Sequence, residues 1–264
     1  MIDKVIQSFD EAVMDVPSGA TILIGGMAHF PSNLIAALAR KGIRDLTVVS
    51  CVLSQAGPSA PRPTSAQGPR DLGADRGAVA APPPADAPYI VTPGLLSELE
   101  MISKGITGFA SGMRGTEPTP FESLVQRGLA TVELNSQGVL AERVRAGKSG
   151  VAAFYTATGV GTPPAEGKEV RLFGGVEYIL EHAIHADFAI VRASAADRWG
   201  NLVYDQPPSF NHVMAGAATV TIAEVDHVVV LGDLRPEHIT TSGVFVDRVV
   251  RVPARPMTSW KEPC

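Results

Sequence analysis

An apolar run that ends at a glycine pair and leads into a helical pattern is the feature that most constrains the fold of this chain. Residues 20–24 are apolar and β-branched, which is typical of a buried strand, and Gly25 and Gly26 follow directly. Residues 33–40 repeat apolar side chains at helical spacing, and a second apolar run lies at 46–50. A helix between two strands over so short a stretch forms a βαβ unit, so the sequence predicts parallel strands here.

The glycine turn is the first candidate site. Ligands bind open parallel sheets where strands end and helices begin, because backbone N–H groups and the helix dipole face that edge. Gly25 and Gly26 would let a ligand or another backbone approach closely, and Ser32 is placed to cap the following helix. His29 lies in the same loop and is a candidate substrate contact. A tight structural turn with no ligand, and a His29 without a role, are the alternatives.

The alternation of apolar runs and helical patterns continues along the chain and predicts the α/β class, with helices covering a mainly parallel sheet. Predicted helices lie at 9–16, 95–103, 120–127 and 139–146, and predicted strands lie at 105–110, 131–134, 151–155, 188–193, 219–225 and 227–231. We expect residues 1–252 to form a single domain, followed by a C-terminal tail at 253–264.

Residues 54–92 interrupt the alternation. Nine of the 21 prolines lie from Pro58 to Pro93, and few large apolar residues occur from 55 to 87. Such a composition buries too little surface to offset the entropy of ordering the chain, which predicts an irregular insertion. A lid over a site, a contact for a partner and a passive insertion remain open.

Composition excludes several classes of function. Lys and Arg number 22 against 27 Asp and Glu, and no basic run occurs, which argues against a nucleic-acid partner. Cys51 and Cys264 are the two cysteines, and no His/Cys cluster indicates a metal site. The start lacks the apolar core of a signal peptide and no run reaches about 18 apolar residues. We therefore expect a cytoplasmic protein with no membrane span.

Two long segments carry a family pattern. Residues 133–147 read Glu-Leu-Asn-Ser-Gln-Gly-Val-Leu-Ala-Glu-Arg-Val-Arg-Ala-Gly, and residues 153–162 read Ala-Phe-Tyr-Thr-Ala-Thr-Gly-Val-Gly-Thr. Shorter matches lie at 17–21, 24–26, 187–191, 196–201, 209–211 and 243–250. In this order they resemble the A (alpha) subunit of family I coenzyme A transferases, of the 3-oxoacid and 3-oxoadipate type. The resemblance covers about residues 5–50 and 95–252 and implies the CoA-transferase fold.

The chain departs from the family pattern at two places. Met27 stands where the family loop has Phe, and that loop reaches Pro31 early. Cys51 and Val52 stand where the family often has an Asn pair. Both places lie near the expected acyl group, so they affect the identity of the substrate more than the fold. The resemblance implies these substrate-binding candidates: Gly25, Gly26, Met27, His29 and Cys51. From the residues alone, Cys51 is expected to be a small buried residue and not a nucleophile, because no His is near it in sequence.

The resemblance also implies a reaction. Such enzymes move CoA between an acyl-CoA and a small carboxylic or 3-oxo acid through a glutamyl-CoA thioester. The nucleophilic Glu belongs to a partner, the B (beta) subunit, in an expected α2β2 complex, and this sequence has no Ser-Glu-Asn-Gly-like element to supply one. No cofactor is implied, because the CoA thioester is a substrate. Gln137 corresponds to a Gln whose amide faces the thioester oxygen, a contact that can be worth about 3 kcal/mol; a helix-cap or turn role is its alternative.

Other polar residues have simpler interpretations. Glu142 and Arg143 are predicted to lie on a solvated helical face, with a mutual pair or a contact to the partner as alternatives. Asp197, Arg198 and Asn201 form a polar turn or part of a site. Two other functions stay open at this point: a sugar-phosphate isomerase of similar fold, for which no clear acid/base set is present, and a transferase-like binding protein without activity.

Overall fold

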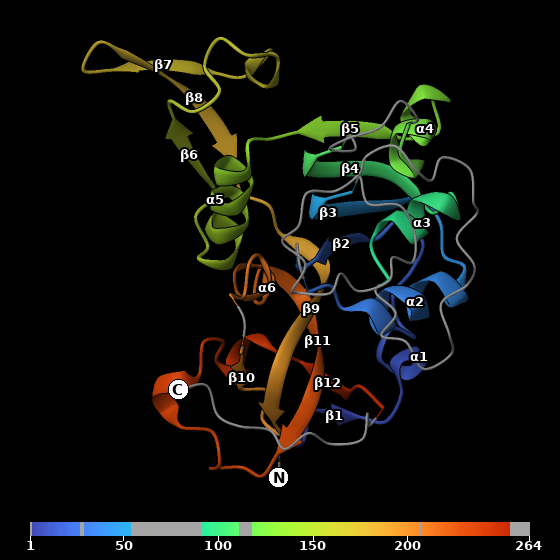
Figure 1. Ribbon diagram of the computed structural model, residues 1–264. Coiled ribbons are helices and arrows are strands. Elements are labelled where there is room, and N and C mark those ends of the chain that lie inside the picture. The colour runs from blue at the N-terminus through green and yellow to red at the C-terminus, as the bar shows by residue number, and fades with distance from the viewer. Residues whose placement is uncertain (1, 27–28, 54–90, 111–117, 206, 254–264) are drawn as a thin grey trace, which may run out of the picture.

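The computed structural model describes residues 2–26, 29–53, 91–110, 118–205 and 207–253 (Figure 1). Within these residues the main sheet has nine strands. They are β1 (Val5–Ile6), β2 (Thr21–Ile24), β3 (Leu46–Val52), β4 (Ile102–Phe109), β5 (Thr131–Leu134), β9 (Ala186–Asp197), β10 (Leu202–Val203), β11 (Ala218–Val229) and β12 (Arg248–Arg251). All neighbouring pairs are parallel except β10 with β9, so the predicted α/β class with a mainly parallel sheet is confirmed.

The strand order places a switch point in the middle of the sheet. The order is β1-β12-β11-β9-β2-β3-β4-β5, so the chain builds outward from β2 in one direction and from β9 in the other. Chain segments that leave β2 and β9 therefore diverge at the carboxyl edge of the sheet. Ligands of open α/β sheets bind at such points, because the diverging loops leave a crevice between them.

Helices cover both faces of this sheet (Figure 1). One face carries α1 (Phe9–Ala12), α2 (Ser32–Lys41), α3 (Gly94–Glu98) and α4 (Pro120–Gln126). The other carries α5 (Gln137–Lys148) and α6 (Asn211–Met214). Short 3-10 helices lie at Pro163–Ala165, Pro236–His238 and Gly243–Phe245.

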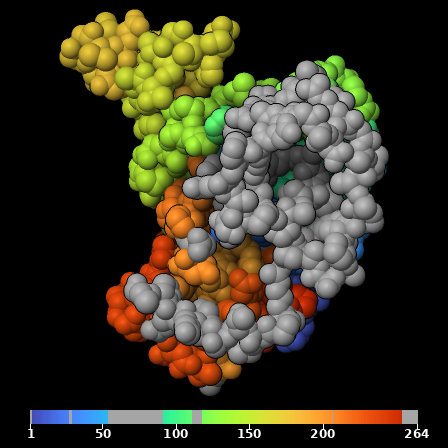
Figure 2. Space-filling view, viewed as in Figure 1, coloured from blue at the N-terminus to red at the C-terminus, as the bar shows by residue number. Residues whose placement is uncertain are grey.

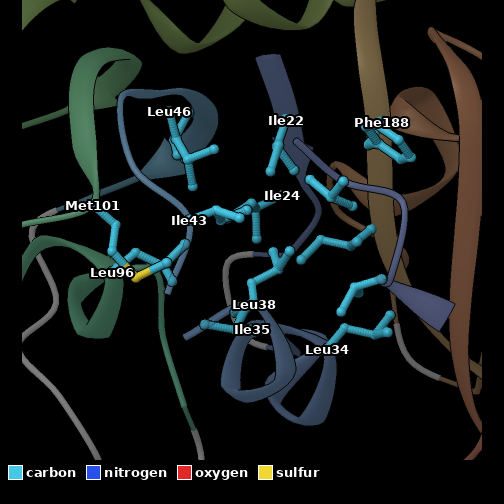
Figure 3. Close-up of a cluster of buried hydrophobic side chains, with 14 of the residues drawn as sticks. Ile22, Ile24, Leu34, Ile35, Leu38, Ile43, Leu46, Leu96, Met101 and Phe188 are labelled. Atoms are coloured by element: carbon cyan, nitrogen blue, oxygen red, sulfur yellow. The ribbon is translucent and has the colours of Figure 1, made fainter. Parts of the chain in front are cut away.

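Alternation along β2 explains the two cores. Ile22 and Ile24 point to the face of α2 and pack with Leu34 and Leu38, as Figure 3 shows. Leu23 points to the opposite face and belongs to the cluster under α5. A strand buried on both sides needs an unbroken apolar run, and that is why residues 20–24 identify it in the sequence. Each of these buried side chains contributes about 1.5–3 kcal/mol.

A second, smaller sheet stands away from the main one, and we call it the outer sheet. It consists of β6 (Ala153–Thr156), β7 (Val170–Phe173) and β8 (Val176–His182) in the antiparallel order β6-β8-β7. Figures 1 and 2 show it projecting beyond α5. The strand predicted at 151–155 thus exists, but it leaves the main sheet, which the alternation pattern did not indicate.

Several predicted boundaries were wrong. The two strands predicted at 219–225 and 227–231 form the single strand β11, because Asp226 points outward to Arg192 and does not end the pairing. The helix predicted at 95–103 stops at Glu98, and a turn with Glu100 at φ +53° leads into β4. The first helix ends at Ala12, four residues before its predicted end. The predicted insertion at 54–92, apart from its last two residues, and the tail after 253 lie outside the described residues.

Candidate active site

Gln137 begins α5 at the carboxyl edge of the sheet. Ser136 is the N-cap of this helix, and its Oγ accepts a hydrogen bond from the Val139 N–H at 3.3 Å. The cap is therefore not the role of Gln137, whose half-buried side chain turns toward β3. Its Nε2 donates to the Sγ of Cys51 at 3.0 Å. Two residues that the sequence singled out separately, 86 positions apart, are thus in direct contact.

Cys51 lies one residue before the end of β3 and is fully buried. Burial raises the pKa of its thiol to about 11, although the hydrogen bond from Gln137 acts in the opposite direction. The thiol is therefore protonated and uncharged near pH 7. This environment agrees with the expectation of a small buried residue and not a nucleophile, because a nucleophilic cysteine needs its thiolate.

A glycine on the neighbouring strand β4, Gly108, leaves room for the Gln137 side chain. A Cβ added to Gly108 would lie 3.0 Å from the Gln137 Cγ and 3.5 Å from the Cys51 carbonyl oxygen. Any larger residue would push the glutamine away from the sheet. Next to it, the Thr107 hydroxyl donates to the Cys51 carbonyl oxygen at 3.1 Å, so β4 also holds the backbone of Cys51.

The glycine turn at the end of β2 packs against β9 and α6, which lie across the switch point from β3. The Gly25 N–H donates to the Ile190 carbonyl oxygen at 2.9 Å. A Cβ at Gly25 would lie 2.1 Å from Asn211 Oδ1, which itself accepts from the Arg192 N–H at 2.9 Å. Gly26 has φ +101°, a conformation that favours glycine. These contacts explain both glycines structurally, and the predicted substrate contacts at Gly25 and Gly26 remain predictions.

The helix after the turn is capped from a distant strand. Glu224 on β11 is buried, and its Oε2 accepts from the backbone N–H groups of Asn33 and Leu34 at 2.9 and 3.1 Å. The predicted Ser32 cap was wrong, because the N-cap position is Pro31 and the Ser32 Oγ instead donates to the Val91 carbonyl oxygen. The N–H groups of Asn33 and Leu34 in the first turn of α2 therefore have an acceptor from the chain itself, the Glu224 side chain.

The register brings the glycine turn and the Cys51–Gln137 pair to one edge of the sheet. Leu23 pairs with Val49, and the Ser50 hydroxyl donates to the Ile24 carbonyl oxygen at 3.1 Å. Gly25 and Cys51 each follow by one residue. His29 is exposed in the bend after the turn, where its carbonyl oxygen accepts from Asn211 Nδ2 at 3.4 Å. Met27 lies outside the described residues.

Arg143 differs from its prediction. It is buried and not on a solvated face: Nη1 binds Glu133 and the Asn135 Oδ1, the latter at 2.8 Å, and Nε donates to the His182 carbonyl oxygen at 2.8 Å. Arg143 thereby ties the loop before Gln137 to the outer sheet. Its neighbour in sequence, Glu142, is exposed and pairs with Arg145 on the helix surface, as a solvated face requires.

Two other residues near the site were not singled out from the sequence. Glu224 carried a signal, since a charged residue stood within the apolar run predicted as a strand at 219–225. Asn211 is the last residue of the segment 209–211 that resembles the family, and the sequence analysis gave it no role.

The polar turn after β9 is held by one of its own side chains. Asp197 accepts hydrogen bonds from the backbone N–H groups of Trp199 and Asn201 at 2.9 and 3.1 Å, so a structural role explains this residue.

Neither a metal cluster nor a membrane-spanning helix occurs in the part of the chain that the structure describes. No group of three or more His, Cys, Asp or Glu side chains is arranged to hold a metal ion among these residues. Among the described helices, none has the length and apolar character needed to cross a membrane.

Comparison with known proteins decides the family. The sequence profile of the coenzyme A transferase family matches residues 6–64 and 89–252. The chain belongs to this family. It is 38% identical over 255 residues to the A subunit of 3-oxoadipate CoA-transferase from Pseudomonas putida, covering 96% of this chain and 95% of that one. Its identity to the A subunit of succinyl-CoA:3-ketoacid coenzyme A transferase from Helicobacter pylori is 36% over 253 residues, covering 95% and 93%. These relatives confirm the resemblance that the sequence motifs indicated.

A solved coenzyme A transferase agrees on the fold. The acyl-CoA transferase of Escherichia coli superposes with a TM-score of 0.70 at 22% identity, over 96% of this chain and 48% of that chain. At this identity the likeness concerns the fold alone. It supports the CoA-transferase fold that the sequence resemblance implied.

Proposed function

We propose that this coenzyme A transferase chain is the A subunit of an enzyme that moves CoA between an acyl-CoA and a small carboxylic or 3-oxo acid. The two relatives compared above are named as A subunits of 3-oxo-acid CoA-transferases, and these names support this substrate class. The observation that carries the proposal is the placement of the Gln137 amide at the carboxyl edge of the sheet, beside the switch point. A neutral donor at this edge suits a negatively charged oxygen that forms during acyl transfer.

The proposed reaction needs a carboxylate nucleophile from the beta subunit. Its Glu attacks the thioester carbonyl carbon of the acyl-CoA, and the C–S bond breaks to give an acyl-glutamyl anhydride and CoA thiolate. The thiolate then attacks the glutamyl carbonyl, releasing the first acid as its carboxylate and leaving a glutamyl-CoA thioester. The same steps in reverse order with a second acid return the Glu carboxylate and form the new acyl-CoA.

In this scheme Gln137 stabilises the oxygen that becomes negative. Each attack converts a carbonyl into a tetrahedral intermediate with an oxyanion, and an amide N–H aimed at that oxygen lowers the barrier. The adjacent Cys51 suits this role, because its raised pKa keeps the sulfur uncharged beside the developing negative charge. We place the substrate acid near the glycine turn, where Gly25, Gly26, Met27 and His29 remain the candidate contacts.

A partner is further supported by the surface of the outer sheet. Val170 and Leu172 lie on one face of this projecting sheet and are exposed by 53% and 64% (Figure 2). Val176 pairs with Phe173 on the opposite face and is exposed by 51%. Extended apolar surface of this kind is typical of protein interfaces. We therefore propose that the beta subunit covers part of this surface, within an α2β2 complex.

The test is reconstitution with the candidate beta subunit. The two chains are co-expressed and co-purified, and transfer is assayed with succinyl-CoA or acetyl-CoA against a panel of 3-oxo acids. Transfer that requires both chains supports the proposal and identifies the acid. A stable complex that transfers CoA to none of the acids would overturn it and favour a binding protein without activity, with Met27, His29 and Cys51 as the first residues to change.

A further inference from the structure

We infer that Cys51 is a positioning residue that holds the Gln137 amide in the orientation from which it donates to the thioester oxygen. The inference rests on the proposed function and adds to it a residue that does not itself touch the reacting atoms. It stands on one contact, the 3.0 Å hydrogen bond from Gln137 Nε2 to Cys51 Sγ, and on the way the surrounding strands fix both partners.

A glutamine side chain needs help to act as a fixed donor. Its rotamer freedom is among the largest of the side chains, and a donor that must be ordered during the reaction loses much of its benefit. The amide group carries two N–H hydrogens. A bond from one of them to a fixed acceptor sets the plane of the group, and with it the direction of the second hydrogen. Cys51 Sγ is such an acceptor.

The acceptor is itself immobile. Cys51 is fully buried near the end of β3, and the Thr107 hydroxyl holds its carbonyl oxygen at 3.1 Å. The stem of Gln137 meanwhile lies over Gly108, where an added Cβ would come within 3.0 Å of Cγ. The amide is therefore held at its tip by the sulfur and limited along its stem by the sheet.

The chemistry of the acceptor also matters. A carboxylate or thiolate beside Gln137 would orient the amide as well, but its negative charge would oppose the oxyanion formed a few ångströms away. An uncharged thiol accepts the hydrogen bond without this cost. The buried, protonated sulfur of Cys51 therefore orients the Gln137 amide without placing a negative charge beside the oxyanion.

A double-mutant cycle in the reconstituted complex tests the inference. Cys51→Ala should lower kcat about 5- to 10-fold with KM for the acyl-CoA within about 2-fold, because the donor is misplaced and not removed. Cys51→Ser keeps an uncharged acceptor and should restore kcat to within about 2-fold of wild type. In a Gln137→Ala background, Cys51→Ala should change kcat by less than about 2-fold, because no amide remains to be positioned.

Val49→Ala is the matched control, since Val49 is another fully buried residue of β3 and belongs to the cluster under α5. Its effect on kcat should be the same in the wild-type and the Gln137→Ala backgrounds. Equal effects of Cys51→Ala in both backgrounds, or a Cys51→Ser variant as slow as Cys51→Ala, would overturn the positioning role while leaving the transferase proposal intact. A wild-type complex without transfer activity would overturn both.

Discussion

The carboxylate of Glu224 on β11 caps α2 by accepting hydrogen bonds from the backbone N–H and the side-chain amide of Asn33, at 2.9 and 2.8 Å. The two residues lie 191 positions apart. Anions bind helix N-termini because the first N–H groups have no partner within the helix. Burial raises the pKa of the Glu224 carboxyl, and Arg192 together with the hydrogen bonds from Asn33 and Leu34 opposes this effect. The Glu224 side chain thus joins this end of α2 and the glycine turn before it to the far half of the sheet.

Loss of that cap should destabilise the protein. Glu224→Ala leaves the N–H groups of Asn33 and Leu34 without their buried acceptor, which we expect to cost about 2–3 kcal/mol of unfolding free energy. Glu224→Gln retains an oxygen for both N–H groups and should cost less than about 1 kcal/mol. Urea unfolding of the two variants provides the measurement. Equal losses in both would show that charge, and not the cap, makes the contribution.

Removal of the Gln137 amide should affect turnover and not folding. We expect Gln137→Ala to lower kcat of the reconstituted complex by about 100-fold or more, because an oxyanion donor is lost. The thermal midpoint should stay close to that of wild type, since Ser136 and not Gln137 caps α5. Glu142→Gln on the exposed face of the same helix serves as the control. Unchanged turnover in Gln137→Ala would rule out the oxyanion role.

Two glycines near the site, Gly25 and Gly138, should differ sharply in their tolerance of a side chain. Gly25→Ala places a Cβ 2.1 Å from Asn211 Oδ1 and 3.2 Å from its Cα, and we expect a loss of about 2 kcal/mol or more. Gly138→Ala in the first turn of α5 meets no atom within 4 Å and should be neutral or slightly stabilising. Denaturation midpoints of both variants decide this. A Gly25→Ala protein as stable as wild type would contradict the packing described for the turn.

Glu133 should make stability depend on acidic pH. Burial alone would raise the pKa of its carboxyl, but hydrogen bonds and charge from Lys104 and Arg143 outweigh burial and hold the pKa below the ordinary 4.5. A carboxyl with a lowered pKa in the folded state adds stability that is fully present above its unfolded pKa and is lost as the pH falls through the folded one. The Tm difference between wild type and Glu133→Gln should therefore be larger at pH 7 than at about pH 4. A difference independent of pH would contradict the prediction.

The Cys51 thiol should resist alkylation in the folded protein. A pKa of about 11, against an ordinary 9.0, leaves about 100-fold less thiolate near pH 8, and only the thiolate reacts. Iodoacetamide labelling followed by peptide mass spectrometry distinguishes Cys51 from Cys264. We expect Cys51 to label at least about 100-fold more slowly in the native complex than in guanidinium. Equal rates would show that the thiol is neither buried nor suppressed.

Local periodicity and contiguous motifs were enough to predict the α/β class, the strand before the glycine pair and the transferase resemblance. Residues 20–24 show this most clearly, since burial on both faces requires an apolar run wherever the strand lies in the sheet. Gln137 was likewise singled out as a candidate because it lies within a contiguous segment that resembles the family, and its role stays a prediction.

Which distant groups meet, in contrast, depends on the tertiary fold. The Glu224 cap on α2, the buried Arg143 and the contact between Gln137 and Cys51 all join segments whose separation along the chain is unrelated to their distance in space. Strand order and register create these contacts, and register depends on the packing of all the side chains together. For the same reason, the carboxyl group of Glu224 on β11 caps α2, although Ser32 is suitably placed in the sequence to do so.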